Sequence, residues 1–526
     1  MRNKFNLKDI LITIFATLIL ACLFLLSDYL YQFVNPNFVC SDKLKIFKLL
    51  IPLCFGLVIN KSKFFIVFCI VFLFLLQMGQ FAHISYFGTQ LSPYDFYQFF
   101  DEYHDVFQEV RNVYFKYWKT ILIVIVPFGL MIPILKLKGF KSYFGVIILF
   151  ATFGWIYYSN CFIRNSTVNE YRFTIDNTLK SFSCFLDLSL RGYNPKPYKP
   201  YTIMKTSLNN EPINIVYILG ESANYRHMFL FGYERNTTSG LIKLSKKSDF
   251  YYTKGIAGGI LTKSSLKFMM NVIGEPDNTQ LSYSDKTNLF KLAKENGFKT
   301  FYISDQLEGL ISIISGKKYI DEIRTASRDK NFDIYTDQHI ITVLNQQTFS
   351  KHNFIVLHQR SVHTPYSKVF SKDFLNRRQF SGAENSVIDE YDNAMVYNDY
   401  VISSLFNYFN KQKIGKFYII WASDHNEFLG ENGLFGHGLL NKMCADIPVI
   451  VQSNDREFLD KFKKIYKPNH YEIAKFIARL LGYEIINPNE DGKTFYISGS
   501  DFNGKYGYIK YEKNSEKRKV TYFNGK

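Results

Sequence analysis

An acid and an imidazole stand side by side at Asp424 and His425, directly after the apolar run KFYIIWAS. A carboxylate and a histidine at the end of a buried strand suit a divalent cation such as zinc, which accepts nitrogen and oxygen ligands. Glu221 follows a second apolar run, INIVYIL, and the ends of two strands are neighbours in a doubly wound sheet. An isolated Asp-His pair is more often structural, and Glu221 also fits an acid near a helix N-terminus. The metal site is therefore a hypothesis that requires further partners.

Thr262 is the candidate nucleophile. It begins the segment TKSSLKFMMNVI, which is typical of a helix whose first-turn amides would face a bound phosphate. Threonine is also a common N-cap, and Ser264 or Ser265 would serve equally well as the hydroxyl. A neutral threonine hydroxyl is a poor nucleophile until a base or a metal lowers its pKa. The hypothesis thus requires that the candidate metal ligands converge on Thr262.

Two further histidines complete the set. His363 lies in SVHTP, and His437 lies near the end of SDHNEFLGENGLFGHG. Each would donate to phosphate oxygens or transfer the proton of an incoming hydroxyl near neutral pH. Each is equally compatible with an ordinary buried histidine. His358 lies in a predicted strand and is interpreted as structural.

From Ile213 onward, short apolar runs alternate with amphipathic segments. This alternation predicts an α/β domain with a mostly parallel, doubly wound sheet covered on both faces. Active residues then gather beyond the carboxyl ends of the strands, where Glu221, Asp305, His363 and Asp424 are placed. The predicted strands are INIVYIL, KTFYIS, NFIVLHQ, KFYIIWAS and DIPVIVQ; the predicted helices are KTNLFKLAKENG, Ser386–Asn410 and His470–Gly482; and Thr494–Phe523 is β-rich.

Residues 1–163 have the character of a membrane domain, because a span requires roughly 20 mostly apolar residues. The run Leu49–Asn60 is short and carries Pro52 and Gly56, but Lys45 and Lys48 can extend from its end toward the interface. We therefore predict a bundle of five spans. They are Ile10–Ser27, Leu49–Asn60, a run beginning at Phe64, Thr120–Leu135 and Ser142–Ile163.

The basic residues predict the orientation of these spans. Lysines and arginines gather at the N-terminus, in the hairpin around Lys61 and Lys63, and between Lys136 and Lys141. With five spans these regions share one side, which the positive-inside rule assigns to the cytoplasm. The chain after Ile163 then lies outside. We predict that residues 93–119 form amphipathic helices at the outer interface. Residues 164–210 are predicted to form a membrane-proximal linker, and residues 211–526 are predicted to form the catalytic domain.

Composition restricts the partners. The formal net charge is +17, but no nucleic-acid motif accompanies it, so an anionic membrane surface is the favoured partner. The seven cysteines show no zinc-binding spacing, and only Cys444 follows Cys184. Disulfides within the soluble part are therefore excluded.

Taken together, these segments resemble the bacterial phosphoethanolamine transferases of the alkaline phosphatase/sulfatase superfamily, which modify lipid A or the lipopolysaccharide core. The resemblance lies in GESANYRHMFLFGYERNTT, GGILTKSSLKFMM, HQRSVHTPY, YDNAMVYNDYVISSLF and SDHNEFLGENGLFGHG, in that order. It implies an inner-membrane protein, multi-pass and monomeric, with its catalytic domain in the periplasm. It also implies one or more zinc ions held by four residues, with two histidines near the substrate phosphate. The ligands are Glu221, Thr262, Asp424 and His425; the histidines are His363 and His437.

The reaction implied by the resemblance has two steps. Thr262 attacks the phosphorus of phosphatidylethanolamine and expels diacylglycerol, and an acceptor on lipopolysaccharide or another envelope glycan then takes phosphoethanolamine from the threonine. Ile260, Leu261, Lys267 and Asn426 depart from the family pattern, and the YDNAMVYNDY block is closer to members acting on core sugars. The alternatives are a phosphoglycerol transferase, a phosphate-ester hydrolase of the same superfamily, or a catalytically silent membrane sensor.

Overall fold

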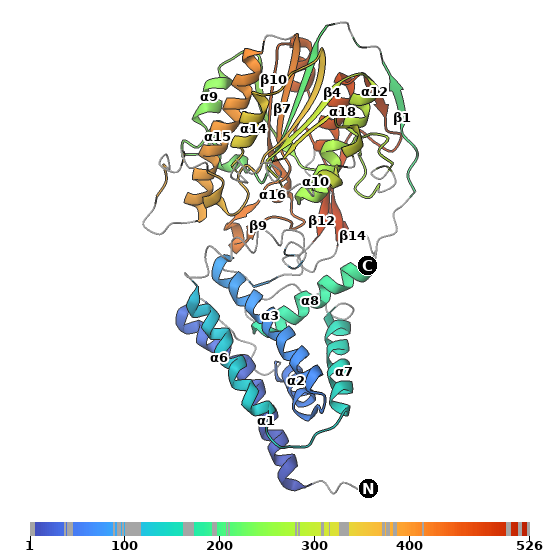
Figure 1. Ribbon diagram of the computed structural model, residues 1–526. Coiled ribbons are helices and arrows are strands. Elements are labelled where there is room, and N and C mark those ends of the chain that lie inside the picture. Colours follow the sequence, from blue (N-terminus) through green and yellow to red (C-terminus); the bar gives the residue numbers. More distant parts are fainter. Residues whose placement is uncertain are drawn as a thin grey trace. The chain divides into compact units, whose positions relative to one another are not determined.

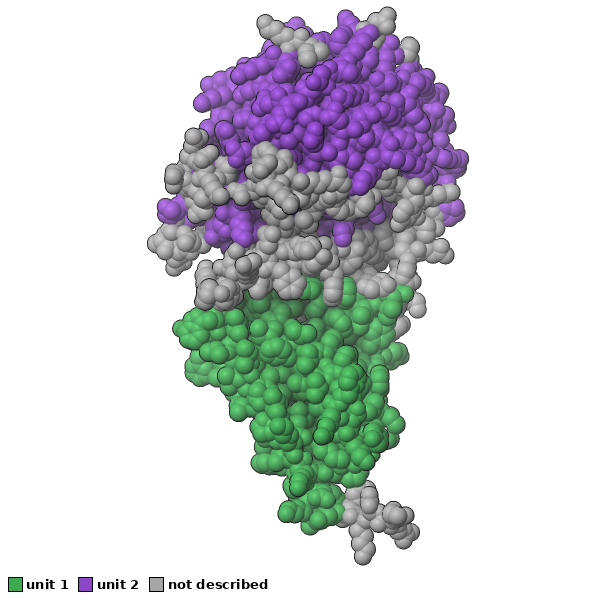
Figure 2. All heavy atoms as spheres, in the orientation of Figure 1, with its two compact units in different colours: residues 1–192, 432–434, 500–505 green, residues 193–431, 435–499, 506–526 purple. Residues whose placement is uncertain are grey.

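The computed structural model divides the chain into two compact units (Figure 2). One unit holds residues 1–192 with 432–434 and 500–505, and the other holds the remainder. The described residues are 6–522 except 36–37, 39–45, 88–89, 92–95, 97–98, 100–116, 161–172, 192–196, 207, 209–210, 279–280, 282–283, 307–309, 315, 326–335, 371–373, 375–378, 382–386, 413–414, 501–505 and 514–517.

The first unit contains an apolar helix at each of the five predicted runs. Three of them, α1, α3 and α6, are long and apolar enough to cross a membrane, whereas α2 and α7 have 13 and 15 residues. An N-terminal apolar helical region is thus confirmed, and five crossings stay a prediction. The helices are α1 (Leu7–Val34), α2 (Phe47–Ile59), α3 (Lys63–Phe87), α6 (Trp118–Leu135) and α7 (Phe144–Tyr158) (Figure 1).

A further helix, α8 (Thr174–Arg191), lies within the predicted linker 164–210. Its N-terminus is held by α1, because both the amide and the hydroxyl of Thr174 donate to the buried carboxylate of Asp28, at 2.9 and 3.0 Å. A carboxylate is favourable there because the first amides of a helix carry partial positive charge. The boundary between the two units falls after Gly192, inside the predicted linker. Most of the predicted amphipathic segment 93–119 lies outside the described residues.

The second unit is built on a seven-stranded sheet of order β3-β10-β7-β2-β6-β4-β5. Pairing is parallel from β7 through to β5 and antiparallel for β10 with both of its neighbours. The strands are β2 (Ile213–Gly220), β3 (Phe250–Ile256), β4 (Lys299–Ser304), β5 (Glu322–Thr325), β6 (His352–His358), β7 (Lys416–Ser423) and β10 (Asp446–Ser453).

The run DIPVIVQ forms the predicted strand, β10, but it is antiparallel to both neighbours, so the sheet is mixed. A parallel pair needs a crossover connection, usually a helix that carries the chain back along the sheet. The segment between β7 and β10 holds only short elements: the hairpin strands β8 (Phe428–Leu429) and β9 (Phe435–Gly436), the 3-10 helix η8 (Glu431–Gly433) and the four-residue helix α16 (Lys442–Ala445). The chain therefore returns in the opposite direction.

Helices cover both faces of this sheet (Figure 1). All eight residues of β2 and all eight of β10 are buried, which explains why their sequences are continuous apolar runs. The predicted helix 386–410 is α15, and the predicted helix 470–482 is α18. One face carries α9 (Ser239–Ser245), α14 (Gln338–Leu344) and α15 (Val387–Lys411), and the other carries α12 (Leu289–Glu295) and α18 (His470–Leu480).

Smaller sheets complete the second unit. The β-rich tail forms a three-stranded sheet of β12 (Thr494–Ser500), β13 (Tyr506–Glu512) and β14 (Arg518–Tyr522). Strand β1 (Thr202–Lys205) pairs with β11 (Tyr483–Ile486). The expectation of β structure in this tail is confirmed.

Candidate active site

The sheet brings the predicted site residues to one edge. Glu221 and Asp424 directly follow the parallel neighbours β2 and β7, and His363 follows β6 by five residues. Strand β3 is antiparallel to β10, which is antiparallel to β7, so β3 runs in the same direction as β7. The segment after β3, which leads to Thr262, therefore also leaves from the edge that holds the carboxyl ends of β2 and β7.

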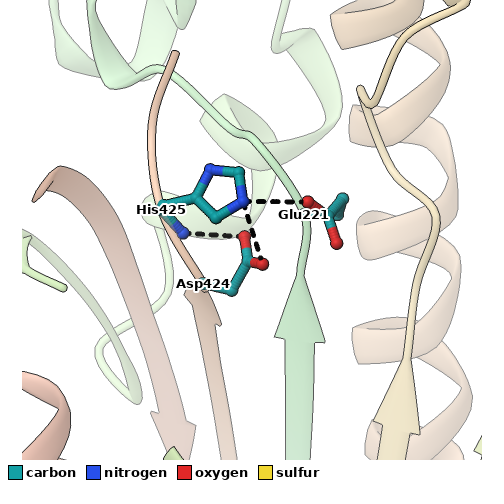
Figure 3. A group of neighbouring side chains, drawn as sticks. All are labelled: Glu221, Asp424 and His425. Atoms are coloured by element: carbon teal, nitrogen blue, oxygen red, sulfur yellow. Dashed lines mark hydrogen bonds and ion pairs between the residues drawn. The ribbon is translucent and has the colours of Figure 1, made fainter. Parts of the chain in front are cut away.

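Four of these residues, which we call the inner cluster, meet directly: Glu221, Thr262, Asp424 and His425. The Thr262 hydroxyl donates to Glu221, with Oγ1 3.0 Å from Oε1 and 3.2 Å from Oε2, and lies 3.2 Å from His425 Nε2. His425 Nε2 is 3.2 Å from Glu221 Oε1 and 3.3 Å from Asp424 Oδ2 (Figure 3). Every member is at most 6% exposed. The convergence on Thr262 that the sequence hypothesis required is present.

Thr262 does not cap its helix. Helix α10 (Thr262–Met270) begins at this residue, its N-cap is Leu261, and no side chain caps it. Ser264 Oγ donates to the Leu261 carbonyl at 2.9 Å, and Ser265 Oγ is buried without a hydrogen-bond partner in the described part of the chain. Of the three hydroxyls that the sequence left open, only that of Thr262 contacts the acid and imidazole side chains of the inner cluster.

The segment before Thr262 packs closely on α10, and two glycines allow this. A Cβ at Gly258 would lie 2.7 Å from the ring of Phe268, and one at Gly259 would lie 2.3 Å from Ser264 Oγ. Real Cβ atoms do not approach neighbours so closely, so any larger residue would push the segment away from the helix. The two glycines therefore allow the close packing that determines the position of Thr262 at the start of α10.

The pKa values in the inner cluster are shifted because the carboxyl groups of Glu221 and Asp424 are buried close to each other. Burial opposes the ionisation of Glu221, but the hydrogen bond and charge of His425, with His363 and Arg360, hold its pKa below the usual range. Burial and then the charge of Glu221 raise the pKa of Asp424 well above its usual range. Burial lowers the pKa of His425, which favours the neutral imidazole. Two neighbouring carboxylates resist ionising together unless a cation lies between them.

The inner cluster fits a divalent cation. Ligand atoms from Glu221, Asp424 and His425 all lie within 4.8 Å of one another. The amides of Ser222 and His425 donate to Asp424 Oδ1, at 3.1 and 2.7 Å, which turns Oδ2 toward the cluster. Two carboxylates, a neutral imidazole and a hydroxyl supply the nitrogen and oxygen donors that zinc accepts. Asp305, also predicted at a strand end, instead accepts from the Asp337 amide.

His363 and His437, which we call the histidine pair, lie beside the inner cluster. The His437 ring centroid is 4.1 Å from that of His425 and 5.6 Å from that of His363. Both members of the pair are 1% exposed. The His437 Nδ1 atom lies 3.6 Å from Glu427 Oε2, and the His363 Nδ1 atom lies 2.6 Å from Arg360 Nη2. The two buried rings thus lie next to one another and beside the inner cluster.

Three buried supporting residues were not identified from the sequence. Gln306 Nε2 donates to Glu221 Oε2 at 3.0 Å, and Arg360 Nη1 donates to Gln306 Oε1 at 3.2 Å. Glu427 Oε1 accepts from the Tyr366 hydroxyl at 2.9 Å. Each follows the end of β4, β6 or β7 within four residues, so position after a predicted strand was the available signal. His358, interpreted as structural, is buried and contacts the Tyr302 hydroxyl at 2.9 Å.

Residues 213–471 match the family model described as sulfatase, and this part of the chain is a sulfatase-family domain. The chain is 27% identical over 258 residues to the Kdo(2)-lipid A phosphoethanolamine 7''-transferase of Salmonella typhimurium, covering 46% of this chain and 44% of the relative. It is 24% identical over 292 residues to the phosphoethanolamine transferase EptA of Helicobacter pylori, covering 52% and 54%. The chain thus spans about half the length of the curated relatives it matches.

Among solved structures, the chain is similar to the integral membrane lipooligosaccharide phosphoethanolamine transferase A of Neisseria meningitidis. The TM-score is 0.60 with 16% identity, over 88% of this chain and 95% of that one. This similarity concerns the fold, and it extends over the apolar helices as well as the sulfatase-family domain.

Proposed function

We propose that the protein is a membrane-bound, metal-dependent phosphoethanolamine transferase. It moves phosphoethanolamine from phosphatidylethanolamine to lipopolysaccharide, on a core sugar or on lipid A. The observation that carries the proposal is the contact of Thr262 Oγ1 with Glu221 and His425 in the buried inner cluster. The names of the relatives, which specify phosphoethanolamine transfer, support the choice of group.

Glu221, Thr262, Asp424 and His425 would hold the cation, for which zinc fits the donor set. When bound, the cation supplies positive charge that lowers the pKa of the threonine hydroxyl and stabilises the phosphoryl oxygens. Around it, the chain excludes water, because all four side chains are nearly inaccessible to solvent. Exclusion of water favours transfer to an acceptor over hydrolysis.

In the first step, Thr262 Oγ1 forms a bond to the phosphorus of phosphatidylethanolamine, and the bond from phosphorus to the diacylglycerol oxygen breaks. The threonine hydroxyl already donates to Glu221, so its proton has an acceptor at 3.0 Å. The departing diacylglycerol oxygen takes up a proton, and the histidine pair supplies N–H groups on that side of the cluster. The product is phosphoethanolamine esterified to Thr262.

In the second step, an oxygen of the glycolipid acceptor bonds to the phosphorus and the bond to Thr262 Oγ1 breaks. The acceptor hydroxyl loses its proton as it attacks, and a neutral His363 or His437 is suited to receive it. The threonine recovers a proton and the cycle closes. The two steps therefore use the same phosphorus and the same surrounding donors.

The apolar helices anchor the enzyme in the membrane that contains its donor lipid. The placement of lysines and arginines supports an inner-membrane protein with five spans and a periplasmic catalytic domain. We propose that it acts as a monomer. Donor and enzyme then share one membrane, so the lipid reaches the site by lateral diffusion.

The test uses the purified full-length protein with zinc and vesicles of defined lipid. Incubation with phosphatidylethanolamine should place a phosphoethanolamine mass adduct on the peptide that contains Thr262, with release of diacylglycerol. Adding lipopolysaccharide should discharge the adduct and label the glycolipid. A phosphoglycerol adduct formed only from phosphatidylglycerol vesicles, or inorganic phosphate without any adduct, would replace the proposal with the related transferase or hydrolase activity.

A further inference from the structure

The segment Ile256–Leu261, which we call the Thr262 arm, is fixed to the domain by four of its backbone amides. Three of them donate to backbone carbonyls, and the fourth, that of Gly258, donates to the side chain of His470, with N 3.1 Å from Nδ1. The carbonyl acceptors are Pro468 for Ile256 at 3.0 Å, Ala445 for Ala257 at 2.8 Å and Ser498 for Ile260 at 3.2 Å. Only one of these four bonds can therefore be removed by changing a side chain.

The same histidine ring holds the other side of the inner cluster. His470 Nε2 lies 3.0 Å from the carbonyl oxygen of Ser423, the residue that precedes Asp424. Because Nδ1 accepts the amide hydrogen of Gly258, the ring hydrogen is on Nε2 and is donated to that carbonyl. One imidazole thus bridges the Thr262 arm and the turn that carries Asp424 and His425.

The ring itself is rigidly placed. His470 is fully buried and is the first residue of α18. The N-cap Asn469 and Glu472 form a reciprocal capping box, which fixes the start of this helix. Burial lowers the pKa of His470 to about 4, so the ring stays neutral and keeps both hydrogen bonds near pH 7.

We propose that His470 is a positioning residue that sets the distance between Thr262 and the Asp424–His425 pair. It touches neither substrate nor cation and acts through the backbone at Gly258 and Ser423. The inference rests on the proposed function for its effect on transfer, but the geometry it controls also determines metal binding. A histidine that only filled space in the core would affect the stability of the domain and nothing else.

Two substitutions of His470 each remove one of its two hydrogen bonds and keep the other. In His470→Asn the side-chain oxygen can still accept from Gly258, and in His470→Gln the longer amide can still donate to Ser423. Each variant should bind zinc about tenfold more weakly than the wild type, the effect typical of removing a partner outside the ligand set. Hydrogen–deuterium exchange should accelerate in the peptide spanning residues 257–261 for His470→Gln and stay slow for His470→Asn.

A double-mutant cycle tests whether the effect passes through the arm. In a Thr262→Ala background, His470→Gln, which loses the bond to the arm, should change zinc affinity less than twofold, because the residue that the arm positions is gone. An undiminished loss of affinity in that background would overturn the proposal, since His470 would then support only the Asp424–His425 turn.

The matched control is Ile477→Ala, a fully buried position on the same helix that contacts neither backbone site through a hydrogen bond. It should lower the Tm while zinc affinity and exchange in 257–261 stay at wild-type values. If both His470 variants behave like this control, the proposal is wrong. If the wild type binds zinc but never forms the Thr262 adduct, the proposed function fails, while zinc affinity and exchange still decide the role of His470.

Discussion

The inner cluster and the histidine pair are built in different ways. Three of the four members of the inner cluster lie at strand ends: Glu221 and Asp424 are the first residues after their strands and His425 is the second, whereas Thr262 comes six residues after β3. Their contacts with Thr262 and His425 are 3.0–3.3 Å long. Such short connections to buried strands leave the side chains few alternative positions. The geometry for the cation is therefore part of the sheet edge itself.

The histidine pair depends on longer connections. His363 comes five residues after β6, and His437 comes 14 residues after the end of β7, with the hairpin β8–β9 between. The His437 ring lies against His425 of the inner cluster, at a centroid separation of 4.1 Å, and the His363 ring lies 5.6 Å from that of His437. Loops of this kind change more readily than strand ends. The cation site is therefore fixed mainly by strand ends, whereas the position of the histidine pair depends on the conformation of two loops.

The largest effect should follow from removing the nucleophile. Thr262→Ala eliminates the oxygen that bonds to phosphorus, and loss of a nucleophile typically lowers turnover on the order of 10⁴-fold or more. The measurements are lipid-to-glycolipid transfer and the mass adduct on the peptide containing residue 262. Both should be absent while the protein remains folded in detergent.

The control for this variant is Ser264→Ala, two residues along the same helix. Its hydroxyl donates to the Leu261 carbonyl and not to the acids of the inner cluster, so transfer should stay within a few-fold of wild type. Turnover retained in Thr262→Ala but lost in Ser264→Ala would identify the serine as the nucleophile.

Asp424→Asn should remove zinc and turnover together. The amide keeps the shape of the side chain but supplies a neutral, weaker ligand, and we expect zinc affinity to fall by more than the roughly 10–100-fold typical of losing a partner outside the ligand set. In the wild type, the raised pKa of Asp424 means that zinc must displace a proton, so affinity should fall as pH is lowered. Zinc content and competition titrations at several pH values measure both effects.

Asp455→Asn serves as the matched control, because this acid caps α17 (Arg456–Lys463) and accepts from Tyr418 in a different part of the domain. Zinc affinity should not change. Retention of zinc in Asp424→Asn at wild-type affinity would show that the ligand set is wrong.

Site residues at strand ends could be predicted from the sequence more readily than residues in loops. A buried strand is a continuous apolar run, so the residue after it can be located from the sequence, as with Glu221 and Asp424. Parallel strands then place those residues at one edge, whatever the intervening sequence. The candidate ligands and the α/β class were therefore accessible before the structure.

Two features were not accessible. The direction of β10 depends on whether the preceding segment crosses the sheet, and an apolar run looks the same in either direction. The roles of residues that act through long-range side-chain contacts, such as Arg360 and His470, were not accessible either, because the local sequence does not identify their partners. Their partners Gln306 and Gly258 are 54 and 212 residues away in the sequence. The spacing of apolar residues does not indicate contacts between positions so far apart.

Substitution of either member of the histidine pair should lower the rate of transfer without changing zinc binding by the inner cluster. His363→Asn and His437→Asn remove proton donors and acceptors beside the phosphate, and such groups typically contribute 10²–10⁴-fold to rate. Zinc content should stay at the wild-type level, because neither ring belongs to the inner cluster. Single-turnover formation of the Thr262 adduct and its discharge by acceptor, measured separately, assign each histidine to a step. Loss of zinc in either variant would move that histidine into the ligand set.

The smallest effect on activity is expected at His358, which ends β6 and belongs to neither region. Burial lowers its pKa to about 4, whereas an unfolded chain has the ordinary histidine value near 6.5. As pH falls from 6.5 toward 4, the unfolded chain therefore binds a proton that the native state does not, and this part of the stability is lost. His358→Asn abolishes that titration while its side chain can still reach the Tyr302 hydroxyl. The free-energy difference between wild type and variant should shrink by about 2 kcal/mol from pH 7 to 4.5, with transfer at pH 7 little changed. A difference that stays constant across this range in denaturant unfolding would contradict a neutral His358 in the native domain.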